Sequence, residues 1–342
     1  MKFNQLLIKS FYPLLFIACQ NHDSFQTINS DEMDSVLDLK HEVATAFYPD
    51  LNYHENIGSI VVYNQYNPLV IAPNPFILRN FEHRDFDTIA NYPSIVISQK
   101  FKDSTQFHFS SDFSTDSTSL AYKHTIISIS SFELTKKFIP DLNGEQDWSV
   151  MVLHELFHDY QRSFKDFERY GRNIMSKYNN QELLHSYFKN ERIKAYILKE
   201  NEILNQIWKE ELDLIDGLNE LAKIRSDRKV YTMDQFAAPI FELENYQVTL
   251  EGHARFFECL AKTYLSNSNG PFKGYNPDND PNLELILNDN YWYALGYNTS
   301  RVLEKFHPAY RMELYQNGKD LNDCLNELND IVLKFEKSIA LM

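Results

Sequence analysis

The sequence predicts an α+β fold in which a small N-terminal mixed sheet is followed by a predominantly helical region. Between residues 57 and 132, short segments rich in Ile, Val, Tyr, Phe, Thr and Ser alternate with Pro, Asn and Asp, as in strands separated by turns. From residue 165 to residue 234, Leu, Ile and Tyr recur at spacings of three and four among Glu, Lys and Asn. This second pattern is typical of amphipathic helices.

The composition is that of a globular protein with an acidic surface. The chain has 342 residues, of which 43% are hydrophobic and 14% aromatic, enough for two or three subdomains that bury cores. Its formal net charge at pH 7 is −15. Because phosphate binding needs a basic surface, this charge argues against nucleic acid as a partner and leaves small molecules, peptides or proteins.

The start of the chain has the features of an export signal. Lys2 and Lys9 precede an apolar run that ends at Cys19, and the run is shorter than the roughly 20 residues of a membrane-spanning helix. Residues 15–19 resemble the lipobox of bacterial lipoproteins, which implies a lipidated Cys19 and a membrane anchor at the cell envelope. Phe16 stands where that pattern has leucine, so an uncleaved anchor or ordinary cleavage stays open.

The periodicity places the other elements in order. A helix is expected over residues 31–47, where apolar side chains recur at helical spacing. Strands are expected at residues 57–72, 94–99, 107–113 and 124–132. Two to four helices are expected over residues 165–234, with residues 179–209 the most periodic, and an Asn-rich loop over residues 266–281.

Residues 148–161 contain the motif His154-Glu155-Leu-Phe-His158. Residues four apart share one face of a helix, so His154 and His158 can offer two imidazole nitrogens to one cation at about 2 Å from each. Glu155 can take a proton from a water on the open position of that metal. The remaining positions form an apolar arc, and Asp147 is the expected N-cap. The alternative is a chance match with two ordinary surface histidines.

Catalytic zinc usually has three protein ligands, so the two histidines need a partner. The segment Glu251-Gly-His-Ala254 resembles the glutamate helix of gluzincins, which are zinc metallopeptidases. The resemblance implies a zincin-like fold, Zn²⁺ held by His154, His158 and Glu251, and cleavage of a peptide or protein substrate with Glu155 as the general base. Small residues beside Glu251 are expected to let the two ligand helices approach closely.

The neighbours of Glu251 suggest supporting roles. Arg255 and Glu258 share its helical face and are expected to orient a ligand from behind, whereas His253 points roughly 160° away. The alternatives are an ordinary ion pair between Glu251 and Arg255, and ligation by Glu258 in place of Glu251.

The resemblance also implies a donor for the oxyanion that forms during peptide hydrolysis. Metallopeptidases commonly use a Tyr or His downstream of the ligands, and Tyr293 is our choice among the tyrosines of residues 291–297, which open a later helix. His307 is the other candidate, and a packing role for Tyr293 is the alternative.

The gap between His158 and Glu251 is longer than in gluzincins whose third ligand follows soon after the motif, which suggests a helical insertion. Cys259 and Cys324 could pair or remain buried thiols.

Two other functions stay open: an inactive zincin-like surface protein that acts as a binding module, and a metallohydrolase of a non-peptide bond. The expected segments are 1–19 (signal), 20–50 (tether and first helix), 51–165 (sheet and motif helix), 166–245 (helical insertion) and 246–342 (C-terminal helices).

Overall fold

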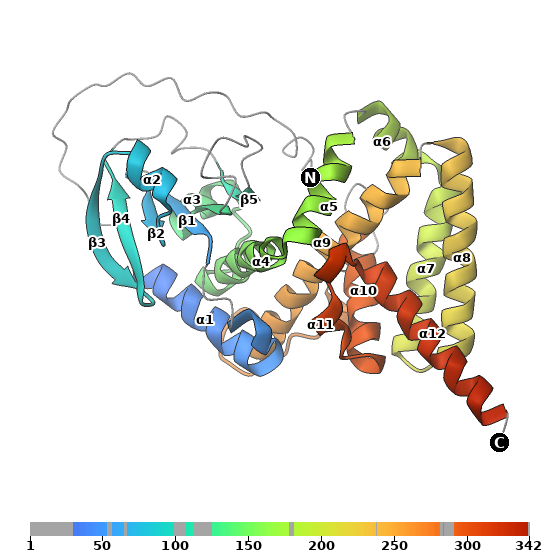
Figure 1. Ribbon diagram of the computed structural model, residues 1–342. Coiled ribbons are helices and arrows are strands. Elements are labelled where there is room, and N and C mark those ends of the chain that lie inside the picture. The colour runs from blue at the N-terminus through green and yellow to red at the C-terminus, as the bar shows by residue number, and fades with distance from the viewer. Residues whose placement is uncertain are drawn as a thin grey trace.

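The computed structural model describes residues 30–52, 57–64, 67–98, 107–112, 125–177, 181–236, 238–280, 283 and 291–340. Within these ranges a six-stranded mixed sheet is followed by a mainly helical region, which confirms the predicted α+β class (Figure 1). Cys19 lies outside the described residues. Of the helices in the described ranges, none combines the length and apolar character that a membrane span requires.

The sheet has the strand order β3-β4-β2-β1-β6-β5. The pair β1 and β6 is parallel, and the other neighbouring pairs are antiparallel. The strands are β1 (Ser59–Tyr63), β2 (Leu69–Ile71), β3 (His83–Ile89), β4 (Tyr92–Ile97), β5 (Phe109–Asp112) and β6 (Ile126–Ser130). The single strand expected over residues 57–72 is therefore two strands, and β3 was not predicted.

Alternation along the strands gives the sheet two buried faces. On β1, Ile60 and Val62 join the large core beneath the sheet, which also contains side chains of α1 (Asp31–Phe47) and α4 (Glu145–Ser163). Val61, between them, points to the other face and packs in a smaller cluster with Ile77 of α2 (Pro75–Asn80). The sheet is thus covered on both faces, and the bounds predicted for α1 are confirmed.

The helical region follows α3 (Phe132–Phe138) and α4. Its helices are α5 (Lys165–Lys177), α6 (Gln181–Lys189), α7 (Glu191–Trp208), α8 (Leu214–Gln235), α9 (Ala238–Leu265), α10 (Tyr291–Phe306), α11 (Tyr310–Glu313) and α12 (Leu321–Ala340), with 3-10 turns η1 (Pro49–Asn52), η3 (Pro277–Asn279) and η5 (Gln316–Gly318). Four helices thus occupy the described part of residues 165–234, as predicted. Residues 179–209 form two of them, because the side chain of Asn190 caps the start of α7.

Helix α4 lies between the sheet and the helical region (Figure 1) and is hydrogen-bonded to three strands or their ends. The Trp148 indole donates to the Ser130 carbonyl (2.9 Å), and Arg162 donates to the Ser111 hydroxyl (2.7 Å). The backbone N–H of Gly58 donates to the Asp159 carboxylate at 2.7 Å. A side chain at residue 58 would meet that carboxylate at 2.6 Å, so only glycine allows this contact.

The sequence also predicts an N-cap for α4, leaves the state of two cysteines open and divides the chain into five segments. The N-cap of α4 is Gly144 at φ 113°, so the prediction of Asp147 was wrong: Asp147 lies in the first turn and accepts from the Asn143 N–H. Cys259 and Cys324 are both buried free thiols. The division into five segments stays a prediction, although α9 runs through the proposed boundary between residues 245 and 246.

Candidate metal centre

The structure brings together His154 and His158 from α4 and Glu251 from α9. One ligand atom from each of these side chains lies within 4.8 Å of the others, and this group could hold a metal ion. Both histidines are buried, and Glu251 is partly buried. Two sequence segments 97 residues apart therefore converge as predicted.

Two of the three distances between these atoms fit a tetrahedral cation. The Nε2 atoms of His154 and His158 each lie 3.4 Å from the same Glu251 oxygen, Oε2. A tetrahedral zinc ion with bonds of about 2.1 Å separates its ligand atoms by about 3.4 Å. A direct charge-assisted hydrogen bond would instead be about 2.7–2.9 Å long. The donor set of two imidazoles and one carboxylate is also the set found in catalytic zinc sites with an open position.

Aromatic packing holds α4 against α9. The rings of Phe157 and Phe257 stack with centroids 4.8 Å apart, on the turn between the two ligand histidines. This contact fixes the distance between the helices that supply the three candidate ligands.

Gly252, one of the small residues beside Glu251, serves a different contact from the one expected. Gly252 faces α10 and not α4: a Cβ at residue 252 would lie 2.4 Å from the Cα of Gly296. The sequence indicated that close backbone approach was needed, but it could not identify the partner helix. The consequence is that α10, which carries Tyr293, is held directly against the turn that carries Glu251.

Glu258 lies behind His154 and not in the metal group. Its Oε2 is 3.5 Å from Nδ1 of His154, the ring nitrogen that faces away from Glu251. Its Oε1 accepts from Arg255 (2.6 Å) and from Lys262 (2.9 Å). Two cations therefore hold this carboxylate in place, and its 3.5 Å contact with the imidazole is electrostatic rather than a well-formed hydrogen bond.

Opposite charges in the site stabilise each other's ionised forms. Burial would lower the pKa of His154, but the carboxylates of Glu251 and Glu258 outweigh it and raise the pKa to about 9. Burial would raise the pKa of Glu251, but the imidazoles of His158 and His154 hold it well below its usual range. Burial likewise opposes the effect of Arg255 and Lys262, which lower the pKa of Glu258. Glu251 is thus ionised, the state in which a carboxylate binds a cation, whereas His154 must lose a proton to become a metal ligand.

Glu155 and Tyr293 lie beside the three candidate ligands. Glu155 is partly exposed, and its charge contributes to the raised pKa of His154. The Tyr293 ring centroid is 6.1 Å from that of His154, and the guanidinium of Arg255 lies 4.8 Å above the tyrosine ring. Burial first, and then the Glu251 charge, raise the pKa of Tyr293 well above its usual value, so its hydroxyl keeps its proton.

His307 is far from this position. It follows the last turn of α10, and the 14 residues from Tyr293 to His307 correspond to about 21 Å along a helix. The two candidates for an oxyanion donor are therefore at opposite ends of α10, and only Tyr293 lies beside the candidate ligands.

The sequence did not single out Gln161, although it is three residues after His158 on the same helix. Its side chain is fully buried, and its Oε1 lies 2.7 Å from Nδ1 of His158. His253 is apart from the candidate ligands, as helical geometry predicted, and contacts the hydroxyl of Tyr315 through Nδ1. Burial, and then the charge of Arg311, lower the pKa of His253 well below its usual range, so this imidazole is neutral.

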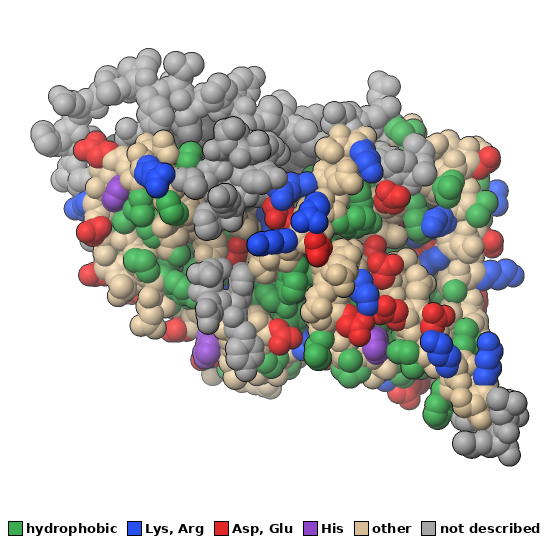
Figure 2. All heavy atoms as spheres, viewed as in Figure 1, with side chains coloured by type: hydrophobic (Ala, Val, Ile, Leu, Met, Phe, Trp, Pro, Cys, Tyr) green, Lys and Arg blue, Asp and Glu red, His purple; other side chains and the backbone are tan. Residues whose placement is uncertain are grey.

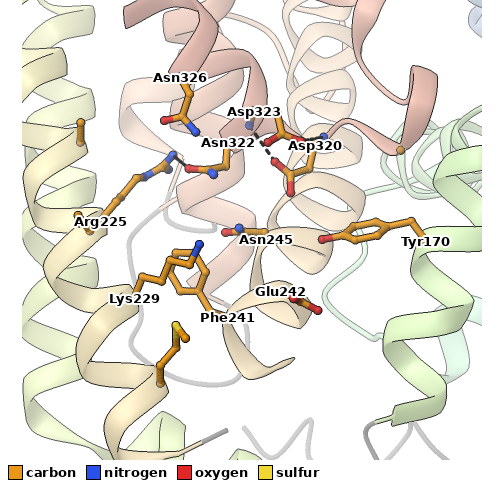
Figure 3. A pocket seen from close by; sticks show the side chains of 14 residues that line it. Tyr170, Arg225, Lys229, Phe241, Glu242, Asn245, Asp320, Asn322, Asp323 and Asn326 are labelled. Atoms are coloured by element: carbon orange, nitrogen blue, oxygen red, sulfur yellow. Dashed lines mark hydrogen bonds between the residues drawn. The ribbon is translucent and has the colours of Figure 1, made fainter. Parts of the chain in front are cut away.

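A cavity of about 560 Å³ lies elsewhere in the helical region and shares none of the candidate ligands (Figure 3). Its wall includes Arg225 and Lys229 of α8, Asn245 of α9, and Asp320 at the start of α12. Burial first, and then the charge of Asp323, raise the pKa of Asp320 to about 7.

Acidic and basic side chains are interspersed over the outer surface of the helical region in the view of Figure 2.

No family model, curated protein or solved structure matches the chain significantly. The assignment of this site therefore depends on its own residues. What they establish is a buried His-His-Glu group that could hold a metal ion.

Proposed function

We propose that the protein is a zinc-dependent peptidase of the gluzincin type, anchored at the bacterial cell envelope through a lipidated Cys19. The observation that carries the proposal is the convergence of His154, His158 and Glu251, with both histidine Nε2 atoms 3.4 Å from one Glu251 oxygen, as between ligands of a tetrahedral zinc ion. The order of charged, apolar and small residues in the first nineteen positions supports the anchor.

The neighbouring side chains suit peptide hydrolysis. A zinc ion held by His154, His158 and Glu251 would supply Lewis acidity toward a water molecule and toward the carbonyl of the scissile bond. Glu155 accepts a proton from that water and later delivers it to the leaving amine. Tyr293, whose raised pKa keeps its hydroxyl protonated, donates a hydrogen bond to the oxygen on which negative charge develops. Glu258 holds the far side of the His154 ring through its contact with Nδ1.

A metal-binding module without turnover is the competing function. Such a module would use the same three candidate ligands. It would not need a partly exposed carboxylate next to them, whereas this chain has Glu155 at that position. Hydrolysis of a bond other than a peptide bond would use the same catalytic groups.

The test combines metal analysis with peptide digestion. Purified full-length protein should carry about one zinc per chain and cleave a peptide library in a chelator-sensitive manner. Glu155→Gln should keep the zinc and lose at least about 100-fold in turnover, because it removes the proton acceptor but no candidate ligand. Glu202→Gln, a change at an exposed glutamate of α7, is the matched control and should keep full activity.

The outcomes separate the functions. Absence of zinc after supplementation, with no effect of chelator on activity or stability, would end the metalloenzyme proposal. Bound zinc without cleavage of any peptide would favour the binding module or another substrate. Near-full activity of Glu155→Gln would remove this residue from the role of base.

A further inference from the structure

We propose that Gln161 is a positioning residue: it sets the tautomer of His158 and fixes this ligand to the helix that carries Glu251. The inference rests on the proposed metal site, because it concerns one of the three candidate ligands. It assigns a role to a residue outside the His-Glu-x-x-His motif.

Two backbone carbonyls define the orientation of the Gln161 amide. The Gln161 amide nitrogen lies 3.2 Å from the carbonyl oxygen of Thr249 and 3.0 Å from that of Leu250. Carbonyl oxygens only accept hydrogen bonds, so the atom that faces them must be the NH₂ group. The same nitrogen lies 2.9 Å from the Tyr315 hydroxyl, a further partner on that side. The opposite end of the amide, which faces His158, is therefore the oxygen.

The tautomer of His158 follows. The Gln161 oxygen can only accept, so the Nδ1 of His158, 2.7 Å away, must carry the proton. When the imidazole is neutral, as a metal ligand must be, its single proton is the one on Nδ1 and the lone pair is on Nε2. This is the nitrogen that lies 3.4 Å from the Glu251 carboxylate, on the side of the candidate metal. Gln161 thus prepares His158 as a ligand.

The same amide also fixes the distance between the two ligand helices. Thr249 and Leu250 are the two residues that precede Glu251 on α9. A single side chain of α4 is therefore bonded both to a candidate ligand of its own helix and to the backbone that leads into the third candidate ligand. Its relative exposure of 0% means that water cannot replace these bonds if the amide is lost.

The bonding continues beyond Tyr315. Its hydroxyl contacts Nδ1 of His253, and Nε2 of His253 lies 3.3 Å from the Tyr310 hydroxyl. Because the Tyr315 oxygen accepts from Gln161, the Tyr315 proton is free to be donated to Nδ1 of His253. This series of hydrogen bonds holds the NH₂ group of Gln161 in one orientation.

The test compares Gln161→Met with a matched control. Methionine keeps the length of the side chain but lacks both amide atoms, and zinc affinity should fall by about 10- to 100-fold. Asn298→Leu removes another buried amide, which bonds Asn201 at 2.6 Å and is not among the contacts of the site. It should lower thermal stability while zinc affinity stays unchanged.

A spectroscopic measurement reads the tautomer without any metal. Ring-¹⁵N-labelled histidine in the metal-free protein, at alkaline pH, should show His158 protonated at Nδ1 in the wild type. The His158 signal is identified as the one that is absent from the spectrum of the His158→Gln variant. Gln161→Met should give a mixture of tautomers, because no acceptor then faces Nδ1 of His158.

The inference is overturned if Gln161→Met binds zinc as tightly as the wild type, or if its His158 keeps a single Nδ1–H tautomer. A wild type that binds no zinc would refute the proposed function instead, and the nitrogen signals would still decide the role of Gln161. If Gln161→Met does not accumulate, the wild type decides: an Nδ1–H tautomer of His158 supports the role, and an Nε2–H tautomer refutes it.

Discussion

Gly252→Ala tests how closely α9 must approach α10. The added Cβ would lie 2.4 Å from the Cα of Gly296 and 2.8 Å from the carbonyl oxygen of Trp292. Non-bonded carbon atoms are best separated by about 3.5–4.0 Å, so the two backbones must move apart by about 1 Å. Neither obstructing atom belongs to a side chain, and no rotamer change can relieve the contact.

The expected magnitude is the difference of two effects. Alanine is favoured over glycine inside a helix by about 1 kcal/mol. Overpacking costs about 1–3 kcal/mol, and a collision between backbones belongs at the upper end. We therefore expect Gly252→Ala to lower the free energy of unfolding by about 2 kcal/mol, although helix propensity alone predicts a gain.

Urea unfolding followed by circular dichroism measures the effect. With a slope of about 3 kcal/mol/M, the midpoint should fall by about 0.7 M. Gly217→Ala on α8 is the control, because its Cβ would meet side-chain atoms of Ile207 and Leu212, which can move, and its loss should stay below about 1 kcal/mol. A Gly252→Ala protein as stable as the wild type would refute the close approach of α9 and α10.

Three further predictions concern other parts of the chain. Glu251→Ala should abolish tight zinc binding, whereas Glu258→Ala should weaken it by about 10- to 100-fold; zinc titration of both variants checks this, and the reverse order would make Glu258 the ligand. Cys19→Ser should release the protein from the membrane fraction or trap a precursor, and unchanged fractionation without lipid on residue 19 by mass spectrometry would contradict the anchor. Asp320, with its pKa raised from 3.8 to about 7, keeps a proton in the folded state that the unfolded chain releases. Its contribution to stability is therefore complete below about pH 4 and lost as the pH rises through about 7. Asp320→Asn should reduce the fall in unfolding free energy between about pH 5 and pH 8 by about 1–3 kcal/mol, and urea unfolding at both values with an unchanged difference would contradict this.

The sequence predicted the elements whose side chains repeat with a clear period. The bounds of α1 and the face shared by His154 and His158 follow from local spacing alone. The strand β3 was missed because most of its side chains are polar and exposed or partly exposed, so no apolar alternation marks it.

Contacts between distant segments could not be predicted in the same way. The role of Gln161 depends on carbonyl oxygens of α9 that are 88 and 89 residues away in sequence. No local sequence pattern predicts these contacts. Gly252 was recognised as a site of close approach, but the partner helix is decided by tertiary packing. Local spacing thus predicted which side chains share a helical face, and only the fold showed what surrounds them.

The separation of 97 residues between His154 and Glu251 has a consequence for folding. In the unfolded chain the two histidines are close together because they are four residues apart. The Glu251 carboxylate reaches them only when a long loop closes. A cation that needs all three groups therefore binds the native state far better than the unfolded ensemble. Through this linkage, free metal at 100 times its dissociation constant would add about 2.7 kcal/mol to stability. Metal content then reports whether α4 and α9 have assembled, and a nascent chain cannot acquire the complete site before residue 251 has been synthesised.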